Sequence, residues 1–191
     1  DLKALLDLLR DKLGQPVDIE FAVSGGNIYL LQCRAQSSAG DQRPMPIPDD
    51  VERDDVLFRA RKHVTNGGVP DLTHLVYVVP EAYAGLPGPE EIAQVARAVG
   101  RLNALLPKRQ FALFGPGRWG SRGDVRLGVP VTYSEINNCA MLIEVARRDG
   151  NYVPDLSFGT HFFQDLVEAQ IRYLPLYPDE PGNVFNERLI D

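Results

Sequence analysis

A proline- and acid-rich stretch, residues 37–55, divides this chain into two unequal parts. It opens with Ser-Ser-Ala-Gly, continues with prolines at positions 44, 46 and 48, and then carries five acidic residues between Asp49 and Asp55. Prolines spaced in this way favour an extended backbone, and neighbouring carboxylates favour contact with solvent. We therefore expect a linker here, with residues 1–36 on one side and residues 56–191 on the other.

Composition restricts the classes of protein to which the chain can belong. Of its 191 residues, 44% are hydrophobic and 24% are charged, which are ordinary proportions for a globular protein. The net charge of −6 gives no general footprint for nucleic acid or for an anionic membrane. Cys33 and Cys139 provide neither a disulfide framework nor a zinc site, so we expect a cytoplasmic protein. Because the chain begins at Asp1 rather than Met, we expect a fragment of a longer protein.

Residues 1–36 have the pattern of one helix followed by a β-hairpin. Leucines recur at helical spacing over residues 2–13, and Gly14 follows as a C-cap. Apolar residues then alternate with polar ones over residues 17–23, a glycine turn follows, and a second apolar run covers residues 28–33. A helix and a hairpin do not enclose a hydrophobic core of their own, so this part reads as an incomplete domain.

Three polar residues of the predicted hairpin are candidates for a site on one of its faces. Gln32 and Arg34 lie two residues apart on one strand and so share a face. Glu20 lies on the same face if the strands pair so that an even-numbered residue is opposite an even-numbered one. A three-residue loop, Ser24–Gly26, gives that register. Such a set suits a magnesium nucleotide, because a carboxylate binds the cation and an arginine binds phosphate oxygens. The alternative is an exposed polar strand face without a ligand.

The sequence around these three residues resembles a known protein family. Residues 14–22 read Gly-Gln-Pro-Val-Asp-Ile-Glu-Phe-Ala, and residues 28–36 read Ile-Tyr-Leu-Leu-Gln-Cys-Arg-Ala-Gln. Both runs resemble the end of the ATP-grasp nucleotide-binding domain of phosphoenolpyruvate synthase and pyruvate phosphate dikinase. That family carries an Asp-Ile-Glu-aromatic-Ala strand, a short glycine turn and a Leu-Gln-x-Arg-Pro strand. One departure is Ala35, where the family usually has proline.

The resemblance implies a function and assigns roles to individual residues. Glu20 matches the family's magnesium-binding glutamate, Gln32 its ATP-site glutamine and Arg34 its phosphate-contacting arginine. The resemblance also implies that the chain is part of an ATP-dependent phosphotransferase, a kinase-like transferase with ATP and Mg²⁺ as cofactors. The missing domains of that enzyme would bind pyruvate or phosphoenolpyruvate. The family's phosphohistidine motif, Gly-Gly-x-Thr-x-x-His, is not found, so its phosphorylated histidine is not carried over to His161. On this interpretation the isolated chain binds ATP poorly and is inactive.

Residues 56–191 carry the pattern of a mixed α/β domain. Pro89 and the two acids after it predict the start of a helix that Pro107 stops, and Thr160 is expected to cap a short helix beginning at His161. The predicted strands cover residues 56–64, 75–79, 111–114, 141–145 and 171–176. The expected fold class is therefore α/β (α+β), with the helix and hairpin followed by a mixed α/β accessory domain.

A glycine-rich loop, Phe114–Asp124, follows one of the predicted strands. Its glycines match the dinucleotide fingerprint in spacing, but glycine and proline just downstream argue against the helix that must open there. A phosphate-loop reading also fails, because the required lysine is absent. An anion site is still open, with Gly117 allowing backbone N–H groups to approach the anion and Arg118 and Arg122 adding charge-assisted bonds. The alternative is a tight structural loop anchored by Trp119.

Two titratable residues of this part are weaker candidates for chemistry. His161 lies among aromatic residues at a helix start, where it acts either as a general acid or base or as a structural residue. Glu144 lies within an apolar strand, and a buried carboxylate needs a partner. We expect Arg118, Arg122 or His161 to supply one, which would join the loop, the strand and the helix in one site.

A second function hypothesis is a non-catalytic regulatory or docking module that binds an anionic ligand at residues 115–122. The segments 115–121, 127–130 and 159–164 resemble a region that follows the ATP-grasp domain in some bacterial synthase-like proteins, which are labelled by their PEP/pyruvate-binding domain. This second resemblance supplies no catalytic residues.

Overall fold

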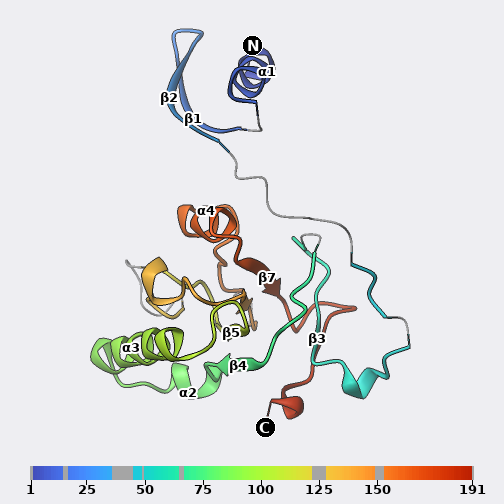
Figure 1. Ribbon diagram of the computed structural model, residues 1–191. Coiled ribbons are helices and arrows are strands. Elements are labelled where there is room, and N and C mark those ends of the chain that lie inside the picture. Colours follow the sequence, from blue (N-terminus) through green and yellow to red (C-terminus); the bar gives the residue numbers. More distant parts are fainter. Residues whose placement is uncertain are drawn as a thin grey trace. The chain divides into compact units, whose positions relative to one another are not determined.

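The computed structural model divides the chain into two compact units, residues 1–40 and residues 41–191 (Figure 1). The structure describes residues 2–14, 17–35, 45–48, 50–64, 67–121, 128–148 and 153–190. Over these ranges no helix is both long enough and apolar enough to span a bilayer.

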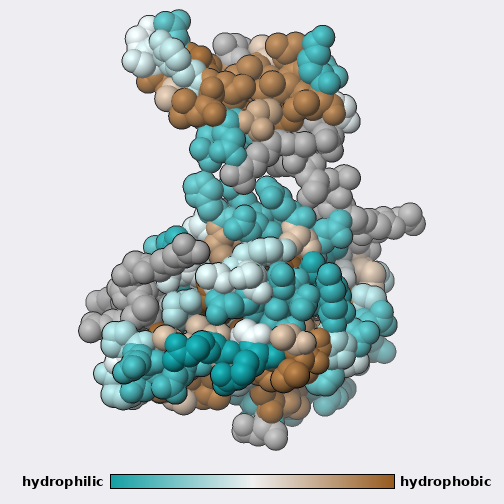
Figure 2. All heavy atoms as spheres, turned by 60° about the vertical axis from the view of Figure 1, so that its left-hand side comes forward, coloured by the Kyte–Doolittle hydropathy of each residue, from teal (hydrophilic) through white to brown (hydrophobic). Residues whose placement is uncertain are grey.

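The first unit consists of one helix and one antiparallel hairpin, as the sequence predicts. Its elements are α1 (Leu2–Leu13), β1 (Val17–Ser24) and β2 (Asn27–Ala35). Gly14 ends the helix at φ 70°, the left-handed conformation that glycine adopts at least cost. None of the described side chains in this unit is buried, and Val23 and Leu31 are 64% and 67% exposed. Figure 2 accordingly shows broad apolar surface on this unit, whose described residues form regular secondary structure without a closed core.

The turn of the hairpin differs from the predicted three-residue loop. Ser24 pairs with Asn27, so the loop contains two residues only, Gly25 and Gly26. Both glycines have positive φ, 57° and 80°, as a type I′ turn requires. The three-residue prediction was wrong because two adjacent glycines allow the shorter turn, whose twist matches that of the strands.

The second unit is built on a four-stranded parallel sheet. Its strands lie in chain order, β4 (His74–Tyr77), β5 (Phe111–Pro116), β6 (Met141–Val145) and β7 (Arg172–Leu176). All four correspond to predicted strands. The strand predicted over residues 56–64 is reduced to β3 (Phe58–Arg59), because its antiparallel partner β8 (Val184–Phe185) offers two residues for pairing.

The sheet is covered on both faces. Parallel strands that follow one another in order place their connecting helices on one side, because the crossovers share one hand. That side holds α2 (Pro80–Ala84), α3 (Pro89–Leu105) and α4 (His161–Glu168), and the ribbon of β3 and β8 packs on the other (Figure 1). The first four residues of β5 are fully buried, with Phe111 and Leu113 in the helix-side core and Phe114 in the ribbon-side core. Burial on both faces explains why this strand is continuously apolar.

Candidate functional site

The hairpin register places Glu20 directly opposite Gln32. A two-residue turn alone would put Glu20 opposite Leu31, which points to the other face from Gln32. A β-bulge between Glu20 and Phe21 shifts the pairing by one residue and brings Gln32 into register. The shared face predicted for Glu20 and Gln32 is therefore present, although the bulge and not the turn produces it.

The next pair on this face joins Asp18 to Arg34. Side chains alternate along a strand, so the register assigns Asp18, Glu20, Gln32 and Arg34 to one face. Arg34 is placed here by its backbone position in β2. Asp18 was not among the candidates identified from the sequence, although its position two residues before Glu20 was a signal for it. We refer to these four residues as the polar hairpin face.

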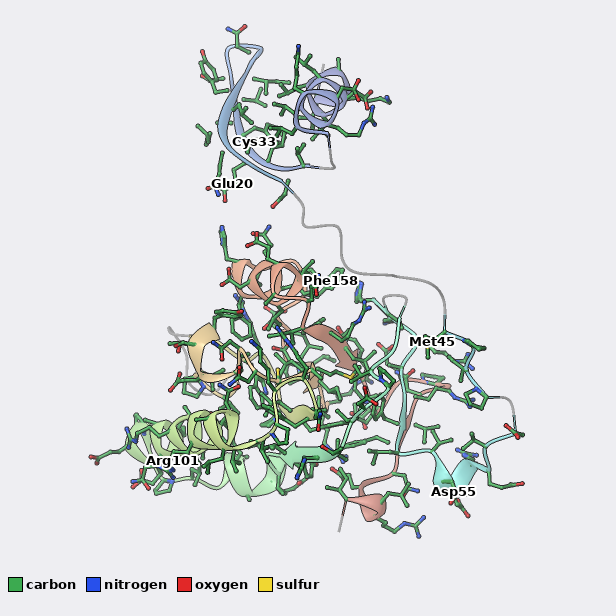
Figure 3. The ribbon with its side chains drawn as sticks, in the orientation of Figure 1. Glu20, Cys33, Met45, Asp55, Arg101 and Phe158 are labelled. Atoms are coloured by element: carbon green, nitrogen blue, oxygen red, sulfur yellow. The ribbon has the colours of Figure 1, made fainter. Side chains whose placement is uncertain are left out.

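The opposite side of the hairpin packs against α1. Ile19 pairs with Cys33, and both are half-buried. Figure 3 shows Cys33 on the side of the hairpin that faces α1, whereas Glu20 lies on the other side of the ribbon and is exposed. Within this unit the helix thus covers the apolar side and leaves the polar hairpin face uncovered.

The donor set of the polar hairpin face suits a metal that a nucleotide helps to hold. Magnesium sites commonly use one or two carboxylates, with substrate phosphates and water completing the octahedron. Asp18 and Glu20 supply two carboxylates on neighbouring same-face positions. In the part of the chain that the structure describes, no three His, Cys, Asp or Glu side chains gather closely enough to hold a metal. Carboxylates, an amide and an arginine are donors that can hold a metal together with the phosphate oxygens of a nucleotide.

The glycine-rich segment after β5 is a packed structural loop. Trp119 is fully buried. A Cβ on Gly115 would lie 2.5 Å from Cζ2 of Trp119, and a Cβ on Gly120 would lie 2.7 Å from the ring of Phe162. These glycines are required because aromatic rings occupy the space of their missing side chains. This corresponds to the Trp119-anchored loop that the sequence left open as an alternative.

Three backbone N–H groups of this loop donate hydrogen bonds to acceptors within the protein. The bonds run from Gly117 N to Val145 O at 2.9 Å, from Trp119 N to Glu144 Oε1 at 2.7 Å and from Gly120 N to Val129 O at 3.0 Å. The N–H of Gly117 thus has an acceptor within the protein, and an anion site at Gly117 stays a prediction. Arg118 is half-buried and Arg122 lies outside the described residues, so anion binding by the two arginines stays a prediction.

Glu144 is fully buried in β6 and accepts four hydrogen bonds. They come from the N–H of Trp119 at 2.7 Å, the N–H of Ser157 at 2.6 Å, the hydroxyl of Ser157 at 2.5 Å and the hydroxyl of Tyr173 at 2.7 Å. Burial raises the pKa of Glu144 to about 7, while the bonds from Ser157, Tyr173 and Trp119 act in the opposite direction.

This arrangement corrects the partners that the sequence suggested for Glu144. Its four donors are backbone and hydroxyl groups rather than Arg118 or His161. His161 is exposed at the first position of α4, which Thr160 caps by accepting a bond from Phe163 N at 3.3 Å. A catalytic role for His161 stays a prediction. Glu144 joins the glycine loop, β6, β7 and the segment before α4 into one buried polar network.

Replacing Gly115 with alanine tests the packing of the loop. The new Cβ collides with Trp119, so we expect the free energy of unfolding to fall by roughly 1–3 kcal/mol, as overpacked cores do. Because Trp119 is the single tryptophan, its fluorescence during denaturation reports the change directly. The matched control is Gly85→Ala, whose Cβ has its nearest neighbour at 3.5 Å. Equal stability of the two variants would show that the loop does not need Gly115.

Replacing Glu144 with glutamine tests the buried network through its pH dependence. Each carboxylate oxygen accepts one backbone N–H, so the amide nitrogen of glutamine faces a donor and costs about 1–3 kcal/mol. A carboxyl pKa raised from 4.5 to about 7 makes the wild type lose about 3 kcal/mol as the pH rises across that range. The variant has no such titration. Urea denaturation at pH 4.5–8 should therefore show the stability gap narrowing with rising pH, and a constant gap would contradict the assignment.

Comparison with known proteins supports a relationship for the first part of the chain. Residues 1–55 match the family model for pyruvate phosphate dikinase, AMP/ATP-binding domain. No curated protein and no solved structure matches the chain. The matched residues include α1, the hairpin and its polar face, and they end before the parallel sheet begins. Over residues 1–55 the chain is therefore similar to the AMP/ATP-binding domain of pyruvate phosphate dikinase.

Proposed function

We propose that this chain is part of an ATP-dependent phosphotransferase resembling phosphoenolpyruvate synthase and pyruvate phosphate dikinase. The polar hairpin face forms one wall of its Mg-ATP site. The observation that carries the proposal is the register that pairs Glu20 with Gln32 and Asp18 with Arg34. These pairs lie inside the segment that matches an AMP/ATP-binding family.

Each residue of the face has a role that follows from its chemistry. Glu20 binds the magnesium ion, with Asp18 as a second carboxylate near it. Arg34 binds phosphate oxygens of the nucleotide, and Gln32 donates or accepts hydrogen bonds through its amide. Phosphoryl transfer depends mainly on positioning and charge neutralisation, so these side chains act by holding the metal and the phosphates in place.

The rest of the site lies outside the described hairpin. The described residues of the first unit expose apolar side chains and include no buried one, as expected for one edge of a larger domain. In this proposal the complete cytoplasmic enzyme supplies the remaining walls of an ATP-grasp site and the domain that binds pyruvate or phosphoenolpyruvate. Residues 56–191 then form an accessory domain.

A titration followed by two-dimensional ¹H–¹⁵N NMR tests the proposal on this chain. With one wall only, we expect Mg-ATP to bind with a dissociation constant of ~1 mM or weaker. Chemical-shift changes should concentrate on the polar hairpin face and depend on magnesium. Glu20→Gln should remove the magnesium dependence, because an amide does not replace the charged ligand of a hard cation.

The matched control is Glu90→Gln, which changes the same side chain in the first turn of α3 and should leave the titration unchanged. Shifts centred on Gly117 and Arg118 would contradict the proposal and favour an anion-binding module. Micromolar affinity in this chain would contradict the idea that the hairpin supplies only one wall. An unchanged magnesium dependence in Glu20→Gln would remove Glu20 from the metal site.

A further inference from the structure

Two donors meet at the carboxyl edge of the parallel sheet in the second unit. Tyr77 is the last residue of β4, and Arg147 lies two residues beyond the end of β6. Because β5 separates these strands, the two side chains approach each other across its end. The guanidinium carbon of Arg147 lies 5.6 Å from the centre of the Phe185 ring, which helps to fix its position.

A carboxylate from the C-terminal end of the described chain occupies these donors. Glu187 accepts a hydrogen bond from the hydroxyl of Tyr77 on Oε1, and Nη2 of Arg147 lies 2.5 Å from its Oε2. Both oxygens of one carboxylate are thus held by groups from two different strand ends. The pair is about one third exposed, so solvent reaches it.

Glu187 does not occupy all the hydrogen-bond donors of Arg147. The Nε atom of Arg147 is buried and has no hydrogen-bond partner among the described residues. The carboxylate of Glu81 lies 3.9 Å from this Nε atom, which exceeds a hydrogen bond, and the Glu81 side chain is 67% exposed. Nε and Nη2 form the side-on fork with which arginine binds carboxylates and phosphates in a bidentate manner. Within the described structure the fork is therefore half used.

The turn that carries Glu187 contributes no buried side chain to the core. It is the 3₁₀ turn η3 (Glu187–Leu189), which has no buried residue, and Leu189 is 46% exposed. Asn186, just before the turn, anchors it through bonds to Leu57 O at 2.7 Å and to Asp54 O at 2.9 Å. A turn without buried apolar side chains opens at low free-energy cost, so its carboxylate can be exchanged for another.

We propose that Tyr77 and Arg147 form a binding site for an oxyanion, the carboxylate or phosphate head group of a small molecule. Glu187 fills this site internally when no ligand is present. A free oxyanion takes the Tyr77 hydroxyl and both arms of the Arg147 fork, and η3 moves away. This inference does not rest on the nucleotide role of the hairpin.

Removal of the internal carboxylate tests the proposal. Acetate and inorganic phosphate, as separate probes at constant ionic strength, are titrated into the labelled full chain and into Glu187→Ala, with NMR signals of Tyr77 and Arg147 as the readout. If Glu187 fills the site nine-tenths of the time, its loss strengthens apparent binding about tenfold. The probe that binds more tightly identifies the head group. Addition of Arg147→Met to Glu187→Ala should abolish the gain.

The control is Glu180→Ala, which removes another ion pair of the same unit, that with Lys62 at 2.6 Å, and should bind neither probe better than the wild type. If Glu187→Ala does not fold, Glu187→Gln serves the same test, because it removes the charge while keeping the shape of the turn. No gain in either folded variant, or a gain that persists with Arg147→Met, overturns the proposal.

Discussion

The polar hairpin face depends on one extra residue in β2. Two adjacent glycines set a two-residue turn, and continued without interruption that register would separate Glu20 from Gln32. The bulge beside Glu20 shifts the pairing by one residue from Glu20 to the end of the hairpin away from the turn. Glu20 therefore lies opposite Gln32. Carboxylates, an amide and an arginine position then share one face, and the apolar residues face α1. A bulge that redirects side chains near a site is a recurrent device of β-structure.

The second unit depends in the same way on one buried carboxylate. Glu144 accepts donors from the glycine loop, from Ser157 and from Tyr173, and so ties three remote segments to the central strand β6. The network also holds the glycine-rich loop that follows β5. The N–H of Trp119 in this loop donates to Glu144, and the ring of Trp119 occupies the space beside Gly115.

Periodicity in the sequence predicted most of the elements but not their pairing. The leucine spacing of α1, the proline start of α3 and the Thr160 cap of α4 are local signals, and all three predictions were confirmed. The bulge and the length of β3 depend on which residues of a distant strand lie opposite. The partners of Glu144 lie 13 to 29 residues away in the chain, so no local pattern identified them. The short helix α2 was missed because five residues carry too little periodicity.

Paramagnetic broadening by Mn²⁺-ATP gives the most direct test of the central claim. Manganese substitutes for magnesium, and its unpaired electrons broaden NMR signals of nearby nuclei. The proposed site predicts that the amide signals of Asp18, Glu20, Gln32 and Arg34 broaden first, and that excess Mg-ATP restores them. Broadening centred on the loop after β5, or on the acidic residues 49–55 with the hairpin unaffected, would contradict it.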